Sequence, residues 1–184
     1  MQVQRLAIPD LMLVVPRRFA DPRGHFAETY TATRFAEIGI DRPFVQDNQS
    51  LSHAAGTLRG LHCQIAPSAQ GKLVRVLRGS IWDVAVDIRS GSPYYGKWIG
   101  VTLTADGGEQ LWIPEGFLHG FLTLEPDTEI LYKVTREYDP ASERGVMWND
   151  PALRIDWPRR DEPTLSEKDK GLPPFAAARN WFPA

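Results

Sequence analysis

The sequence predicts an all-β protein whose strands form an antiparallel sandwich or barrel. Short segments rich in Val, Ile, Leu, Tyr and Trp recur along the chain at intervals of about 8–12 residues, which is typical of such folds. Turn sequences such as Asp21-Pro22-Arg23-Gly24 and Asp106-Gly107-Gly108 separate these segments. Helical periodicity is weak throughout. Together these three observations favour sheets over helices.

Each expected strand is a short apolar run that ends at a turn signal. These runs are 11–19, 73–77, 81–88, 98–103, 110–113, 120–124 and 129–136. In the third run, Trp82, Val84 and Val86 alternate with Asp83 and Asp87. Because successive side chains of a strand point to opposite faces, we expect one face of this strand to lie on a core and the other to carry the aspartates.

Helices are expected only at the periphery. Residues 33–38 have the length of two turns, and Ser166 has the character of an N-cap before a short helix at 167–169. No internal repeat and no linker composition divides the chain. We therefore expect residues 1–184 to form a single domain, with a Pro-rich tail from about residue 150 packed on the barrel.

Composition excludes several classes of protein. The 184 residues include 42% hydrophobic residues and carry a net charge of −2, so nothing suggests disorder or a nucleic-acid partner. No apolar run approaches the ~18 residues of a membrane span, and the first ten residues lack the pattern of a signal peptide. Cys63 is the one cysteine, so no internal disulfide is possible. A cytoplasmic protein without a membrane partner is expected.

Two histidine motifs occur where strands are expected. Gly56 followed at the sixth position by His62 resembles the first motif of the cupins, and Gly108 through His119 resembles the second. Either histidine alone would more often be a hydrogen-bonded structural residue than a catalyst. The two motifs together imply a cupin-like double-stranded β-helix, or jelly-roll, barrel with short peripheral helices and a site in its mouth.

The metal set of the cupins is incomplete in this chain. Gln64 stands where metal-binding members have a second histidine, which leaves two imidazoles for a metal that needs three or four ligands. Cys63 is a poor replacement because it points to the opposite side of an extended strand from His62. We therefore expect no metal.

A closer resemblance covers nearly the whole chain. Its motifs are FADPRGHFAE (19–28), QDNQS (46–50), LRGLHCQ (58–64), Lys72, PEGFLHGF (114–121), Tyr132 and SEKD (166–169). In this order they resemble the RmlC family, the dTDP-4-dehydrorhamnose 3,5-epimerases. The resemblance implies an isomerase that inverts C3 and C5 of dTDP-4-dehydro-6-deoxy-D-glucose to give dTDP-4-dehydro-L-rhamnose in dTDP-L-rhamnose biosynthesis. It also implies no cofactor, and a homodimer with an exchanged N-terminal strand.

The resemblance assigns four catalytic residues. His62 matches the base that removes a proton beside the C4 ketone, and Asp169 matches the residue that orients it. Lys72 matches the cation beside the ketone oxygen. Tyr132 matches the acid on the opposite face of the sugar. Without the resemblance, Tyr132 would be read as a core tyrosine between Ile130 and Val134.

The dTDP part of the implied substrate accounts for further polar residues. By the same resemblance Arg23, Arg59 and His119 face the diphosphate, and Tyr138 stacks on thymine. Other substrate-contacting positions are Glu28, Gln46, Asp47, Asn48, Glu143 and Lys168, of which Glu28, Glu143 and Lys168 have a second interpretation as solvated surface charges. An ideal strand puts Arg59 and His62 on opposite faces, so either Gly60 forms a bulge or one of them acts differently.

Two other functions stay open at this point. One is a different enzyme on the same scaffold, namely an epimerase acting at a single carbon or a ketoisomerase. The other is a non-catalytic cupin that binds a small anion. Retention of His62, Lys72 and Tyr132 together argues against the non-catalytic alternative.

Overall fold

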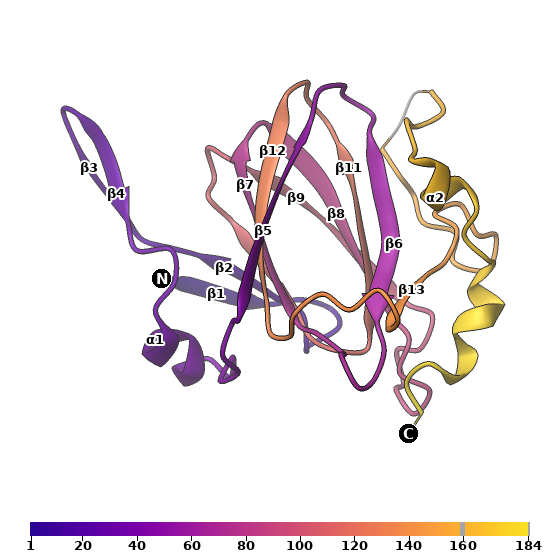
Figure 1. Cartoon of the computed structure of the whole chain (residues 1–184). Coiled ribbons are helices and arrows are strands. Elements are labelled where there is room, and N and C mark those ends of the chain that lie inside the picture. Colours follow the sequence, from indigo (N-terminus) through magenta and orange to yellow (C-terminus); the bar gives the residue numbers. More distant parts are fainter. Residues whose placement is uncertain (159–160, 184) are drawn as a thin grey trace.

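The computed structural model describes residues 1–158 and 161–183 (Figure 1). Three short helical segments lie among the strands: α1 (Ala32–Glu37), α2 (Glu167–Lys170) and a 3₁₀ helix (Phe175–Asn180). The strands are β1 (Gln2–Arg5), β2 (Met12–Val15), β3 (Arg18–Asp21), β4 (Gly24–Ala27), β5 (Gln46–Ser52), β6 (Leu58–Gln64), β7 (Lys72–Arg78), β8 (Ser80–Asp87), β9 (Trp98–Thr104), β10 (Gln110–Ile113), β11 (Phe117–Thr123), β12 (Thr128–Val134) and β13 (Glu143–Gly145).

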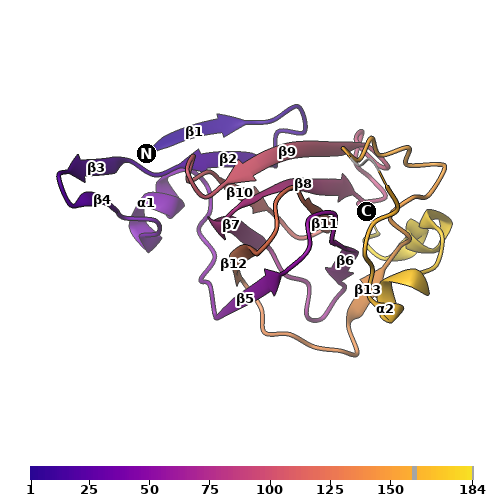
Figure 2. The same ribbon diagram turned by 90° about the horizontal axis from the view of Figure 1, so that it is seen from above.

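The strands form two large antiparallel sheets that face each other (Figure 2). The six-stranded sheet has the order β1-β2-β10-β7-β12-β5, and the five-stranded sheet has the order β13-β6-β11-β8-β9. The hairpin of β3 and β4 belongs to neither sheet and extends away from both, on the side opposite the C-terminal segment (Figure 1). The prediction of an all-β antiparallel sandwich is therefore confirmed.

An inner core fills the space between the sheets. Alternate residues of facing strands supply it, among them Val74 and Val76 of β7, Ile81 and Ala85 of β8, and Phe117 of β11. All five are nearly or fully buried. This alternation defines which face of each strand points inward, and the polar residues of the site follow the same alternation.

Further cores cover the outer face of the five-stranded sheet and part of the outer face of the six-stranded sheet. On the five-stranded sheet, an outer core joins Leu61, Val84 and Leu118 to the C-terminal residues Trp157 and Ala178. On the six-stranded sheet, Met12, Leu73 and Trp112 pack against Phe35 of α1 and Ile40. The five-stranded sheet and this part of the six-stranded sheet are therefore buried on both faces, which explains why several strands are continuously apolar. The assignment of the whole chain to one domain stays a prediction.

The expected strand at 11–19 is wrong in its extent. The chain forms β2, then leaves the sheet at Pro16 and starts β3 at Arg18. Proline has no N–H to donate to a strand ladder, so the break falls where the chain must change direction. The other six expected strands are confirmed, with ends that differ by a few residues.

The two faces of β8 divide as the sequence predicts, but the face that carries the aspartates is buried as well. Asp83 and Asp87 are fully buried, and their side chains point inward beside Ala85. The partners of these carboxylates explain how they tolerate burial: Asp83 accepts from His119, and Asp87 accepts from Arg89. The apolar residues Val84 and Val86 face the outer core instead.

Strand β5 was not predicted because its inward face is polar. Gln46, Asn48, Ser50 and Ser52 point inward, and Leu51 is among the residues that point outward and are exposed. This reverses the usual pattern of a half-buried strand, since the inward residues line a pocket rather than a core. No helix among the described residues is long and apolar enough to cross a membrane.

Candidate active site

His62 and Asp169 form a bonded pair at the inner surface of β6. The Nε2 atom of His62 lies 2.6 Å from Oδ1 of Asp169, which is carried by helix α2. The N-cap of this helix is Ser166, whose Oγ accepts from the Asp169 N–H, as the sequence predicts. Burial by itself would raise the pKa of Asp169, but the bonds from His62 and from the Gly60 N–H hold it below its ordinary value. The carboxylate is therefore kept charged beside the imidazole.

A bulge in β6 brings Arg59 to the same face as His62. His119 pairs with His62 and Phe121 pairs with Arg59, so two residues of β6 stand opposite Gly120 alone. Gly60 has a φ of +118°, a conformation that favours glycine. The conflict between residue spacing and a shared site is thus resolved by the bulge at Gly60. Cys63 points to the outer core, as expected, and burial raises the pKa of its thiol to about 12.

The pocket in front of this pair lies between the two sheets. The five-stranded sheet contributes His62, Arg59 and His119, and the six-stranded sheet contributes Lys72 and Tyr132. Base and acid candidates therefore occupy opposite walls. A planar group held between them would meet an imidazole on one face and a phenol on the other.

Burial changes the acid–base properties of the wall that Lys72 and Tyr132 form. It lowers the pKa of Lys72, an effect that the charges of Cys63, Asp83 and Glu143 oppose. Burial raises the pKa of Tyr132. At neutral pH the phenol is therefore protonated, and the lysine supplies a poorly solvated positive charge.

An adjoining pocket shares three of these residues and extends toward the β12–β13 loop. Gln46, Asn48, Tyr138 and Glu143 line it together with His62, Lys72 and Tyr132. The Tyr138 hydroxyl donates to Glu143 over 2.8 Å, and Glu143 forms an ion pair of 2.5 Å with Lys168. The ring of Tyr138 is half exposed at the mouth. Glu143 and Lys168 are thus part of one network and are not isolated surface charges.

The family is decided by comparison with known proteins. The family model described as dTDP-4-dehydrorhamnose 3,5-epimerase matches residues 5–177. The chain belongs to this family. A relative of the same description from Pseudomonas aeruginosa is 53% identical over 184 residues, which is 100% of both chains.

Solved structures of the dTDP-4-dehydrorhamnose 3,5-epimerase family and its neighbours share the fold. The Legionella pneumophila dTDP-6-deoxy-D-glucose-3,5-epimerase, in complex with dTDP-4-keto-L-rhamnose, superposes with a TM-score of 0.90 at 45% identity over 94% of this chain and 92% of that one. A 3′-monoepimerase from Streptomyces bikiniensis, in complex with dTDP-quinovose, also gives a TM-score of 0.90, at 35% identity over 97% of this chain and 91% of that one. The cupin-like jelly-roll class is confirmed.

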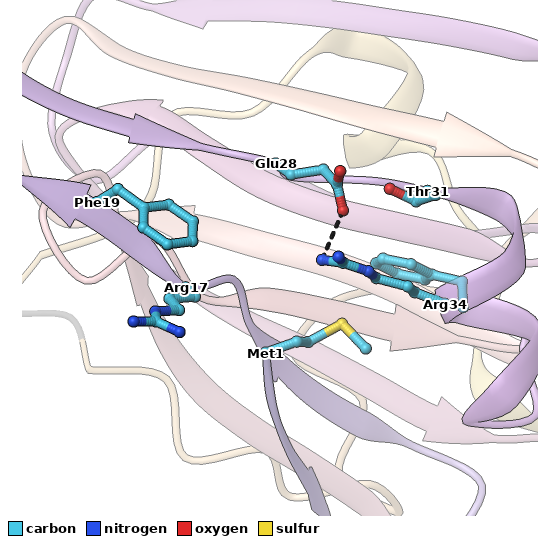
Figure 3. A pocket seen from close by; sticks show the side chains of 7 residues that line it. Met1, Arg17, Phe19, Glu28, Thr31 and Arg34 are labelled. Carbon is cyan, nitrogen blue, oxygen red and sulfur yellow. Dashed lines mark ion pairs between the residues drawn. The ribbon is translucent and has the colours of Figure 1, made fainter.

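Three residues that the family resemblance assigns to the substrate lie outside both pockets. Asp47 points to the outer side of β5 and binds Lys133 over 2.9 Å. Arg23 is at the tip of the β3–β4 hairpin, paired with Asp21, and its side chain is 89% exposed. Glu28 pairs with Arg34 over 2.8 Å in a separate pocket near Met1 and Thr31 (Figure 3). Within the described chain these three do not join the epimerase-family site.

Three residues that line the pocket were not predicted from the sequence as site residues. Ser50, Phe121 and Ser166 line the pocket beside His62. The alternation of β5 could have found Ser50, since it shares a face with Gln46 and Asn48. No group of three or more His, Cys, Asp or Glu side chains among the described residues is placed to hold a metal ion. Metal independence stays a prediction.

Proposed function

We propose that this chain catalyses the 3,5-epimerisation of dTDP-4-dehydro-6-deoxy-D-glucose to dTDP-4-dehydro-L-rhamnose. The observation that carries the proposal is the position of His62 and Tyr132 on opposite sheets across one pocket, with Lys72 beside them. Inversion at carbon needs a base on one face and a proton donor on the other. The family and its relatives support the same reaction.

The chemistry follows from the acidity of protons beside a ketone. His62 takes the proton from C3 or C5, and the electrons of the broken C–H bond move toward the C4 oxygen to give an enolate. Lys72 stabilises the negative charge on that oxygen, where its lack of solvation strengthens the interaction. Tyr132 returns a proton to carbon from the opposite face, and Asp169 stabilises the imidazolium that His62 becomes.

The polar residues around the reacting centre suit a nucleoside diphosphate. Arg59 and His119 lie at one end of the pocket and present donors for phosphate oxygens. Tyr138 offers an exposed ring at the other end, where a thymine can stack. No cofactor is needed, since the reaction moves protons only.

We further propose a homodimer in which the β3–β4 hairpin reaches the pocket of a second copy. The hairpin projects from the sheets (Figure 1). Its residues Phe19 and Phe26 have exposed rings. Exposed aromatic rings of this size are typical of interfaces. Such an arrangement would bring Arg23, at the hairpin tip, to a diphosphate. Sedimentation of the wild-type chain and of Phe26→Ser tests it, with a monomeric wild type as the contradicting result.

A single-carbon epimerase is the second candidate, because the Streptomyces bikiniensis neighbour is a 3′-monoepimerase of the same fold. Incubation with dTDP-4-dehydro-6-deoxy-D-glucose in deuterated water separates the functions. We expect deuterium at both C3 and C5, with inversion at both. Exchange at one carbon would indicate the single-carbon reaction. Absence of exchange at both carbons would indicate a protein that binds its ligand without catalysis. A cytoplasmic location is proposed from the lone, buried Cys63.

A further inference from the structure

A carboxylate outside the assigned catalytic set faces the same interior as Lys72. Asp83 lies on β8 with no exposed surface, and its Oδ1 accepts from Nε2 of His119 over 2.8 Å. Its second oxygen, Oδ2, is buried without a hydrogen-bond partner within the described chain. An unsatisfied buried carboxylate oxygen is costly, so a compensating charge is expected nearby.

Lys72 is the complementary group. Strand alternation points it inward with Val74 and Val76, just as it points Asp83 inward with Ile81 and Ala85. Within the described residues, Lys72 forms no ion pair and no side-chain hydrogen bond. Its side chain is half-buried and lines both pockets, and the charge of Asp83 is among those that favour its protonated form.

The other carboxylates near Lys72 are already engaged. The charged and titratable groups around it are Arg59, His62, Cys63, Asp83, His119, Tyr132, Glu143, Lys168 and Asp169. Asp169 is bonded to His62, and Glu143 is paired with Lys168. Among these carboxylates, Asp83 is the one with an oxygen, Oδ2, that has no partner among the described residues and can balance the positive charge of Lys72.

We propose that Asp83 is a positioning residue for the epimerase reaction, because one carboxylate holds His119 in place and faces Lys72 across the interior of the sandwich. This inference rests on the proposed function. Oδ1 accepts from Nε2 of His119 and so fixes the orientation of that ring, which lines the pocket. The second oxygen keeps Lys72 an ammonium at the pH where an enolate must be stabilised.

Asp83→Asn tests the charge with little change in shape. We expect kcat to fall by about 10- to 100-fold. The alkaline limb of kcat/KM should move to lower pH by about one unit, because a buried lysine without an opposing carboxylate loses its proton more readily. Burial raises the pKa of Tyr132 and lowers that of Lys72, which favours the lysine over the phenol as the group that sets this limb. Asp83→Glu keeps the charge and should restore the position of the limb while turnover stays low.

Asp87→Asn is the matched control. Asp87 is equally buried, on the same strand and face, but its carboxylate binds Arg89. We expect its removal to lower the thermal midpoint and to leave the pH profile of turnover unchanged. If Asp83→Asn does not accumulate as folded protein, Asp83→Ser provides the same comparison with a smaller side chain.

A second readout does not depend on turnover. The ¹⁵N resonance of the Lys72 amine, assigned by its absence in Lys72→Met, reports the pKa of that lysine by titration. We expect a lower pKa in Asp83→Asn than in wild type and an unchanged one in Asp87→Asn. Coincident titrations and coincident pH profiles for wild type and Asp83→Asn would overturn the inference. Absence of inversion by the wild type would instead count against the proposed function alone.

Discussion

Nε2 of His62 and Oδ1 of Asp169 lie 2.6 Å apart although the two residues are 107 positions apart in the sequence. Strand β6 holds the histidine, and the C-terminal segment returns along the five-stranded sheet to place α2 beside it (Figure 2). The N-cap bond from Ser166 to Asp169 fixes the helix at the point of contact. The candidate base is therefore oriented by a segment that the barrel strands do not include.

Loss of the imidazole should therefore cost more than loss of the carboxylate. We expect His62→Ala to lower turnover by about 10²–10⁴-fold, the usual contribution of a general base. Asp169→Asn should lower it less, because it removes orientation and charge but leaves the base. Steady-state assays measure the turnover of both variants. His53→Ala is the control, since His53 pairs with Asp127 away from the pocket. Near-normal exchange in His62→Ala would exclude this assignment.

Tyr132→Phe should separate exchange from inversion. The ring and its packing beside Ile130 remain, but the proton for the far face is lost. We expect deuterium to enter through His62 while inversion falls, most visibly at C5. Proton NMR of the sugar in deuterated water measures both. Tyr95→Phe removes a phenol from the outer core and serves as the control. Wild-type inversion by Tyr132→Phe would remove this residue from the mechanism.

The arginines should act in binding rather than in proton transfer. We expect Arg59→Ala to raise KM more than it lowers kcat, because a guanidinium on a diphosphate contributes equally to ground and transition states. Arg23→Ala should likewise raise KM more than it lowers kcat if the β3–β4 hairpin reaches the pocket of a second copy. Arg78→Ala, an exposed residue at the end of β7, should change neither. A larger loss in kcat than in KM would place the arginine at the enolate.

The bulge in β6 should tolerate no side chain at Gly60. A Cβ there would lie 2.6 Å from the Gly120 Cα, and the positive φ adds strain. We expect Gly60→Ala to lower the free energy of unfolding by at least about 1–3 kcal/mol. Urea denaturation measures the change. Gly171→Ala, where a Cβ meets nothing nearer than 3.7 Å, is the control. Equal stability of both variants would contradict the role of the bulge.

Turnover should not depend on a metal. Gln64 accepts from and donates to backbone groups of the neighbouring loops, so its side chain is already engaged. We expect full activity after dialysis against a chelator and no stoichiometric metal by elemental analysis. Bound metal whose removal abolishes turnover would reverse this expectation.

Local patterns in the sequence were enough to predict most of the strands. Apolar alternation located β7 to β12, and the side chain of Ser166 predicted the start of α2. The same patterns failed at β5, because its inward residues are polar. They also did not show that the face with Asp83 and Asp87 is buried, since alternation shows that two faces differ but not whether each is buried.

By itself, the sequence determined the all-β class, the strand alternation and the family motifs, because these depend on neighbours within a few residues. The tertiary structure decided which side chains meet. The bulge at Gly60 turned Arg59 and His62 to one face, and facing sheets set Tyr132 opposite His62. Asp83 became a partner of His119 because β8 and β11 are neighbouring strands of one sheet, with Asp83 opposite Phe121. Such contacts join residues far apart in the chain, and no local pattern encodes the distance between them.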